Sequence, residues 1–255
     1  MESFTNYPNI NRLLRIITKD VHKILGDKLL GFYLTGSLTY DDFTPGRSDI
    51  DLFGVVSEPI TQKENVALEL MHIRIEEENR EWHQRIESQY VPISFFRHTL
   101  PPKTPRPYYG EGKFYPEALY GNEWLINNYL LYKYGVTLYG KDFQGLLNPI
   151  DIEEVKIACI RDLHEEWEPK VNDPDYLNNP HYQSYVVLNI CRILYAVRNS
   201  ELASKTKSAE WVYSKFEQWR ELINAAQSWE YGEEMNYEGE TRKFIQFAVD
   251  KVASE

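Results

Sequence analysis

A Gly-Ser pair followed by two closely spaced aspartates is the part of this sequence best suited to chemistry. Gly36 and Ser37 end the apolar segment 31–35, and Asp49 and Asp51 come after a polar stretch. A Gly-Ser turn at the end of a buried strand can open a helix whose free backbone amides donate hydrogen bonds to phosphate oxygens. Gly36 and Ser37 are therefore predicted to contact the phosphates of a ligand.

The two aspartates supply a possible metal site. If 49–53 is a strand, its period of two places Asp49 and Asp51 on one face, with Ile50 and Leu52 on the other. Two carboxylates about 7 Å apart along a strand can share divalent cations. Mg²⁺ prefers oxygen ligands and keeps part of its shell for substrate phosphates. The segment predicts a site for a metal-nucleotide complex, and Ser48, directly before it, is assigned to the same ligand.

This arrangement resembles the signature of the nucleotidyltransferase superfamily, in which Gly-Ser and Asp-x-Asp are completed by a third acid on a later strand. Glu87 matches that third acid, because the segment 85–93 alternates like a strand. The resemblance implies that Asp49, Asp51 and Glu87 are catalytic and together bind two Mg²⁺ ions, with Glu87 as the general base.

A plainer interpretation of the acids also exists. Since 39 of the 255 residues are acidic, an isolated Asp-x-Asp can arise by chance or serve as a surface pair. The Gly-Ser turn before it, the apolar strand residues on both sides and the later strand with Glu87 favour the functional interpretation.

Composition narrows the classes of partner. A length of 255 residues and a hydrophobic content of 42% allow a substantial core, so a globular protein is expected. The net charge of −11, without a run of lysines or arginines, argues against nucleic acid as a partner and suits a small cationic molecule. No signal peptide and no apolar stretch long enough to span a bilayer is visible, so a cytoplasmic protein without a membrane partner is expected. Cys159 and Cys191 lie among apolar helical neighbours and are predicted to be buried thiols.

The order of elements predicts two domains. Residues 1–150 mix strands and helices, whereas 151–255 contain helices only. The fold class is therefore α+β followed by all-α: a small mixed sheet flanked by helices, then a helical bundle. An active site in the cleft between the two domains is expected. In the first domain we predict the following elements: helices 8–25, 62–82 and 116–134, strands around 32–34, 49–56, 85–93 and 136–140, and a long loop over 98–115.

In the second domain the predicted helices are 153–167, 182–199, 208–229 and 238–252. The acidic run 76–78 in the first domain is interpreted as the solvated end of a helix without a chemical role. The histidines are scattered without the spacing of metal ligands, and none is assigned a role.

The segments 186–195 and 204–211 resemble the helical domain of aminoglycoside adenylyltransferases that act on streptomycin and spectinomycin. With the amino-terminal motif and the segment 136–140, the resemblance covers nearly the whole chain. It implies that Lys205 contacts the nucleotide phosphates, that Tyr231 lies near the nucleotide, and that Arg192 adds positive charge. A lysine at a helix end is also commonly a surface charge, and Tyr231 is one of 19 tyrosines.

The departures from this family fall where the acceptor should bind. The family places acids directly before the helix that contains 186–195, but the segment 176–183 has none. The loop tryptophan that the family uses against streptomycin has no counterpart in 108–115, and the nearest tryptophan is Trp124. These losses disfavour streptomycin more than spectinomycin. Other nearby acids could bind a cation or simply lie at a helix end without a binding role: Glu165, Glu166, Asp173 and Asp175.

The resulting prediction is a Mg²⁺-dependent, monomeric enzyme that transfers AMP from ATP to a hydroxyl of an aminoglycoside or aminocyclitol antibiotic and so confers resistance. Two alternatives stay open. One is a nucleotidyltransferase with another acceptor, such as a lincosamide or a protein hydroxyl. The other is a non-catalytic nucleotide-binding regulator or antitoxin-like protein that kept the fold.

Overall fold

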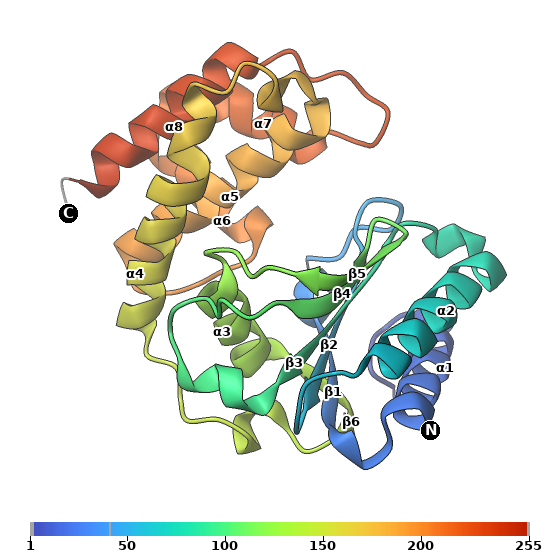
Figure 1. The fold of residues 1–255 in the computed structure, drawn as a ribbon. Coiled ribbons are helices and arrows are strands. Elements are labelled where there is room, and N and C mark those ends of the chain that lie inside the picture. The colour runs from blue at the N-terminus through green and yellow to red at the C-terminus, as the bar shows by residue number, and fades with distance from the viewer. Residues whose placement is uncertain (1–2, 41, 254–255) are drawn as a thin grey trace. The chain divides into compact units, whose positions relative to one another are not determined.

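The computed structural model describes residues 3–40 and 42–253, and so leaves out the first two residues of the polar start. The chain divides into two compact units, residues 1–149 and 150–255, each with its own architecture. Figure 1 shows strands and helices in the first unit and helices in the second. The predicted fold class, a mixed sheet with helices followed by a helical bundle, is confirmed.

The first unit is built on one six-stranded sheet with the order β5-β4-β3-β2-β1-β6. β2 and β3 are parallel, and the other neighbouring strands are antiparallel. The sheet is therefore mixed, and the parallel pair at its centre carries two of the three predicted acids, Asp51 and Glu87. Its strands are β1 (Leu29–Thr35), β2 (Ile50–Val56), β3 (Ile86–Pro92), β4 (Arg106–Gly110), β5 (Lys113–Ala118) and β6 (Val136–Gly140).

Two helices, α1 (Pro8–Leu25) and α2 (Gln62–Glu78), cover one face of this sheet, and Figure 1 shows them together on one side. Pro8 occupies the first turn of α1, where a missing backbone N–H is tolerated. α2 begins with a capping box, in which Thr61 and Glu64 satisfy each other's backbone amides. The core between helices and sheet includes the inward residues of the central strands: Phe32, Leu34, Ile50, Leu52, Ile86 and Tyr90.

The opposite face is only partly covered. A cluster of aromatic rings packs on it, with Phe143 lying 5.3 Å from Tyr33 and 6.2 Å from Phe53 between ring centroids. Phe96 joins the cluster and reaches Trp124, at the start of α3 (Trp124–Tyr134). The alternate residues of β2 and β3 toward their amino-terminal ends, among them Asp51, are half-buried.

The prediction of a long loop over 98–115 is wrong, because this segment contains β4 and the beginning of β5. The two strands form a hairpin in which Gly110 pairs with Lys113. Its two turn residues, Glu111 and Gly112, have φ values of 52° and 71°, as a tight two-residue hairpin turn requires. The prediction failed because the prolines of this segment were interpreted as loop residues. β4 pairs with β3 only at Tyr108 and Tyr109, so Pro107 interrupts no hydrogen bond of that ladder.

Two predicted helices of the first unit have other bounds. The helix predicted over 116–134 begins at Trp124, because 116–118 belong to β5. The helix over 62–82 ends at Glu78 and is followed by a 3₁₀ turn, Arg80–Trp82. The acidic run at its end is not uniformly solvated, since the buried carboxylate of Glu76 accepts a hydrogen bond from the Gln84 backbone amide (3.0 Å) and contacts His83 Nδ1 (3.0 Å).

The second unit is a bundle around α5 (Pro180–Asn199), and its described residues form no strand. The neighbouring helices are α4 (Ile152–Asp162), α6 (Lys205–Lys215), α7 (Arg220–Ser228) and α8 (Glu238–Val252). The predicted single helix 208–229 is two helices, because Phe216 leaves the helical region at φ −130° and packs its ring on Phe247. Both cysteines are buried free thiols, as predicted, and burial raises the pKa of Cys159 to about 12. No helix among the described residues has the length and apolarity needed to cross a bilayer.

Candidate active site

The predicted phosphate turn follows β1 directly. Gly36 opens a short 3₁₀ helix, Gly36–Thr39, and its φ of 69° lies in the left-handed region that favours glycine. A Cβ at this position would stand 1.8 Å from Oδ2 of Asp51. The glycine is therefore required for two reasons: the backbone conformation, and the space that the Asp51 carboxylate occupies beside the turn.

Two of the three predicted acids lie side by side. Asp51 on β2 is the register partner of Glu87 on the parallel strand β3, and of Thr35 at the end of β1. Because neighbouring strands are about 4.8 Å apart and registered residues share a face, both carboxylates project from the same face of the sheet. The fold thus brings together the Gly36 turn, Asp51 and Glu87, which are distant in sequence.

Asp49 stands just before β2 and has a cationic neighbour. Its Oδ1 atom lies 3.7 Å from Nε of Arg85, and the same guanidinium donates to the backbone carbonyl of Ser48. The Ser48 hydroxyl accepts a hydrogen bond from the backbone amide of Thr44 at 3.0 Å. Ser48 and Asp49 therefore belong to a turn that is held in place by its own polar contacts and by Arg85.

The fit of these residues to magnesium rests on their chemistry and register. Within 3–40 and 42–253, no group of three or more His, Cys, Asp or Glu side chains is arranged to hold a metal ion. The Asp49 carboxylate lies near the guanidinium of Arg85. Asp51 and Glu87 nevertheless present adjacent carboxylates, the ligand type that Mg²⁺ prefers.

The structure adds two residues that the sequence did not single out. Tyr108 on β4 donates a hydrogen bond to Glu87, and burial together with the Glu87 and Asp51 carboxylates raises its pKa. Buried Arg106 donates from Nε to Oε1 of Gln89 (2.7 Å) and from Nη1 to the backbone carbonyl of Leu119 (2.7 Å). Both lie in the segment that was predicted to be a loop; recognising the Glu111-Gly112 hairpin turn would have placed them on a strand beside Glu87.

The residues predicted in the helical unit lie in two places. Lys205 is the first residue of α6, and its Nζ stands 4.4 Å from the centroid of the Tyr185 ring. Tyr231 is 55% exposed and packs against His181, with ring centroids 5.2 Å apart. His181 also lies 6.0 Å from Tyr185, so a chain of rings joins Tyr231 to Lys205. Arg192 is half-buried on α5, and its charge lowers the pKa of the Cys159 thiol, against the larger effect of burial.

Comparisons with known proteins identify the families that the two units resemble. Residues 14–103 match the family model described as nucleotidyltransferase domain, and residues 145–255 match aminoglycoside adenylyltransferase, C-terminal domain. The chain belongs to the aminoglycoside adenylyltransferase family. It is accordingly a nucleotidyltransferase of the adenylyltransferase type.

A solved structure extends the likeness of fold over the whole chain. The crystal structure of spectinomycin adenyltransferase AAD(9) from Enterococcus faecialis, with ATP and spectinomycin, superposes with a TM-score of 0.69 and 20% sequence identity. The match covers 95% of this chain and 98% of the other. The search of curated proteins found no match.

Two of the acids near the expected acceptor position, Asp173 and Glu166, make local contacts, and Trp124 is buried. The Asp173 carboxylate accepts hydrogen bonds from the backbone amides of Tyr176 and Asp175, which lower its pKa and fix a turn. Glu166 lies 3.5 Å from Nζ of Lys170. Trp124 is buried and donates its indole N–H to the carbonyl of His98, so it offers no exposed ring for stacking.

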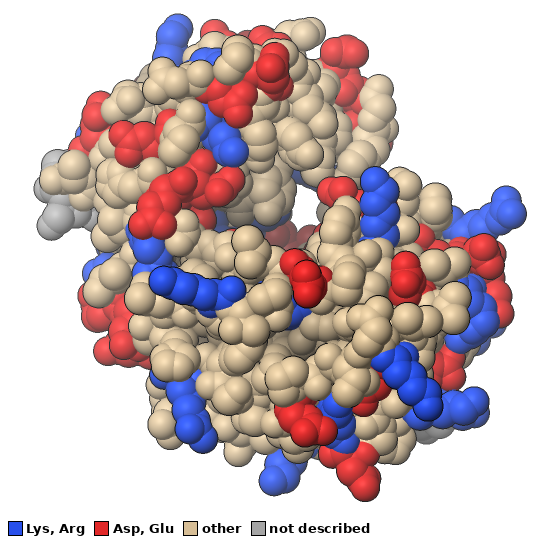
Figure 2. All heavy atoms as spheres, viewed as in Figure 1, with Lys and Arg blue, Asp and Glu red and all other residues tan. Residues whose placement is uncertain are grey.

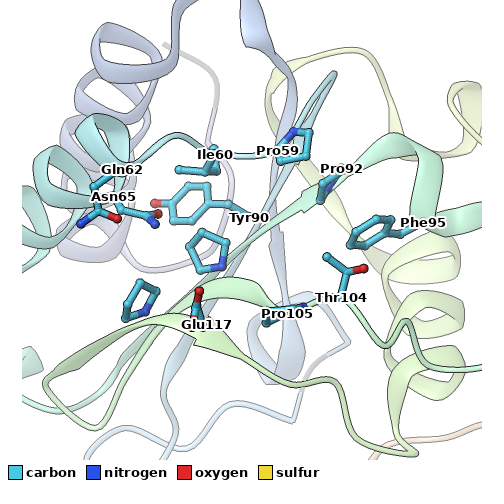
Figure 3. A pocket seen from close by; sticks show the side chains of 12 residues that line it. Pro59, Ile60, Gln62, Asn65, Tyr90, Pro92, Phe95, Thr104, Pro105 and Glu117 are labelled. Atoms are coloured by element: carbon cyan, nitrogen blue, oxygen red, sulfur yellow. The ribbon is translucent and has the colours of Figure 1, made fainter.

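A pocket of about 350 Å³ lies elsewhere in the first unit of this family member. Figure 3 shows it around Tyr90, with Asn65 and Gln62 from α2 on one side and Glu117 from β5 on another. None of the three predicted acids is among the described residues that line it. Its position does not support a catalytic role. On the face seen in Figure 2, acidic and basic side chains are interspersed.

Proposed function

We propose that this enzyme transfers AMP from ATP to a hydroxyl of an aminoglycoside or aminocyclitol antibiotic, with spectinomycin favoured over streptomycin. The observation that carries the proposal is the in-register pair of Asp51 and Glu87 beside the Gly36 turn, in a chain of this family. The spectinomycin preference is supported by the solved relative with ATP and spectinomycin, and by the buried position of Trp124.

The proposed metal ligands are Asp49, Asp51 and Glu87, which would hold two Mg²⁺ ions. Bound magnesium would neutralise phosphate charge and favour in-line displacement at phosphorus. For Asp49 to take part, its carboxylate must turn from Arg85, whose Nε is 3.7 Å away. An ammonium-rich acceptor also suits the acidic chain, with its net charge of −11.

In the proposed reaction, Glu87 takes the proton from the acceptor hydroxyl. The oxygen attacks the α-phosphorus of ATP, the bond from that phosphorus to the bridging oxygen breaks, and pyrophosphate leaves. Gly36, Ser37 and Ser48 would hold the phosphates through the turn. Lys205 and Arg192 would add positive charge for the triphosphate, and Tyr231 would contact the nucleotide.

Removal of the base tests this role. Glu87→Gln should leave ATP binding nearly intact and lower turnover by about two to four decades, the usual contribution of a general base. Calorimetry with ATP and Mg²⁺ gives the binding constant, and pyrophosphate release gives turnover. The matched control is Glu117→Gln, an exposed glutamate of β5. Turnover equal to that of the control would remove Glu87 from the chemistry.

The acceptor is tested with labelled ATP, Mg²⁺ and a panel of spectinomycin, streptomycin, other aminoglycosides and a lincosamide. We expect labelled spectinomycin with release of pyrophosphate. Labelled lincosamide, or labelled protein, in place of a labelled aminoglycoside or aminocyclitol would contradict the proposed acceptor. Binding of ATP without pyrophosphate release from any mixture would contradict the proposed reaction itself.

A further inference from the structure

The side chain of Tyr108 runs along β4 over a glycine. A Cβ added at Gly110 would stand 2.3 Å from the Tyr108 hydroxyl oxygen and 2.6 Å from its Cζ. Tyr108 and Gly110 are two positions apart, so they share a face of the sheet. The missing side chain at Gly110 therefore provides the space in which the Tyr108 hydroxyl lies.

The strand register shows what stands opposite that space. In the antiparallel ladder of β3 and β4, Gln89 pairs with Tyr108 and Ser88 pairs with Tyr109. Continuing this register by one residue places Gly110 opposite Glu87. The Tyr108 ring thus extends toward Glu87, and its hydroxyl donates a hydrogen bond to the Glu87 carboxylate.

Two side chains hold the ring in this orientation. The guanidinium carbon of Arg106 is 5.6 Å from the centroid of the Tyr108 ring. Tyr115, on the other strand of the hairpin, stacks on the Tyr108 ring with a centroid distance of 6.1 Å. Arg106 is itself fixed by Gln89, by the Leu119 carbonyl and by the Tyr120 ring, 4.2 Å away. These contacts hold the hydroxyl in place on the hairpin.

We propose that Tyr108 is a positioning residue for Glu87, with its hydroxyl bound to one carboxylate oxygen so that the other oxygen faces the acceptor hydroxyl. The inference rests on the proposed role of Glu87 as the base. A free glutamate side chain would sample several rotamers, and in only some of them does a carboxylate oxygen face the acceptor. The hydrogen bond selects one orientation before the substrates arrive.

Two variants remove the contact in different ways. Tyr108→Phe deletes the donor, and Gly110→Ala places a methyl group where the hydroxyl lies. Each should lower kcat by about 10- to 100-fold, the usual effect of losing a partner that orients a catalytic ligand, with KM for ATP within about twofold. The matched control is Tyr109→Phe, because the Tyr109 hydroxyl donates to a carboxylate, that of Glu76, on the other face of the sheet. It should affect stability without changing kcat.

Double variants separate positioning from a general structural effect. In the Glu87→Gln background, Tyr108→Phe should cause no further loss of kcat, because Tyr108 acts through Glu87. An equal loss in both backgrounds, or an unchanged kcat in Tyr108→Phe, would overturn the proposal.

A spectroscopic measurement tests the contact without any activity. In protein labelled with ¹³C at the glutamate carboxyl carbon, the resonance that disappears in Glu87→Gln belongs to Glu87. That resonance should shift in Tyr108→Phe and in Gly110→Ala and stay in place in Tyr109→Phe. An unchanged resonance in Tyr108→Phe would overturn the inference even if AMP transfer is confirmed. A shifted resonance in a protein that transfers no AMP would retain the contact and reject the proposed function.

Discussion

The two faces of the central sheet are built from the same strands but surround polar groups with different neighbours. On the face covered by α1 and α2, buried His72 contacts the Tyr90 hydroxyl at 3.0 Å, and burial lowers the pKa of His72 to about 3. On the other face, Asp51 and Glu87 lie side by side with the Tyr108 hydroxyl. On the first face burial keeps the imidazole of His72 uncharged, whereas the second face places two carboxylates next to each other.

This difference follows from the alternation of side chains along a strand. Leu52 and Asp51 are neighbours in sequence, yet one packs in the core and the other lies by the Gly36 turn. Substitutions at adjacent positions should therefore separate stability from activity.

The largest effect is expected from Asp51→Asn. We expect AMP transfer to fall by about a thousandfold or more, since several kcal/mol of charge stabilisation by the metal would be lost. Thermal stability of the metal-free protein should not fall, because a negative charge is removed from beside Glu87. Pyrophosphate release and calorimetric unfolding measure the two quantities. Asp27→Asn, at an exposed position, is the control. Unchanged transfer would place Asp51 outside the reaction.

Leu52→Ala should have the reverse pattern. Its side chain is 2% exposed, and truncation of a buried leucine costs about 2–5 kcal/mol of unfolding free energy. At a temperature where the variant is folded, its kcat should be close to that of the unchanged enzyme. Leu70→Ala on α2 is the control, because Leu70 is 62% exposed and should lose little. Denaturant titration checks the stability; a kcat that falls with it would mean that the two faces are not independent.

Gly36→Ala tests the contact between turn and acid. A left-handed backbone conformation costs a non-glycine residue about 1–2 kcal/mol, and here the new Cβ would also displace the Asp51 carboxylate. The matched control is Gly46→Ala, because Gly46 has a φ of 85° and a Cβ added there would meet nothing within 4 Å. Both variants should lose similar stability, but only Gly36→Ala should lose AMP transfer. Equal transfer in the two variants would argue against the contact with Asp51.

The effect that is smallest at neutral pH concerns protonation on the covered face. Because the pKa of folded His72 is about 3 and the ordinary histidine value is 6.5, the unfolded chain binds the proton first as pH falls. His72 therefore contributes stability above pH 6.5 that is lost as the pH falls toward 3, by up to about 1.4 kcal/mol per pH unit. His72→Gln should show a shallower loss of unfolding free energy over this range, and exposed His98→Gln should retain the full slope. Parallel slopes for His72→Gln and the unchanged protein would contradict this account.

Much of the fold could be predicted because its signals are local. The period of α1, the strands on either side of Gly36 and the helical character of 151–255 depend on residues close in sequence. The β4–β5 hairpin was missed because its prolines and glycines were interpreted as loop residues, although Glu111 and Gly112 form a tight turn. The break at Phe216 was missed because the packing of its ring on Phe247 joins two helices that are distant in sequence.

The sequence by itself determined the candidate reactive residues, their spacing and the family, since a Gly-Ser turn and an Asp-x-Asp strand are local patterns. Only the tertiary structure decided that Glu87 lies in register with Asp51, that Tyr108 binds Glu87 over Gly110, and that Arg85 lies beside Asp49. The physical reason is that strand pairing joins residues far apart in the chain, and a shift of one residue in register would send each of these side chains to the opposite face.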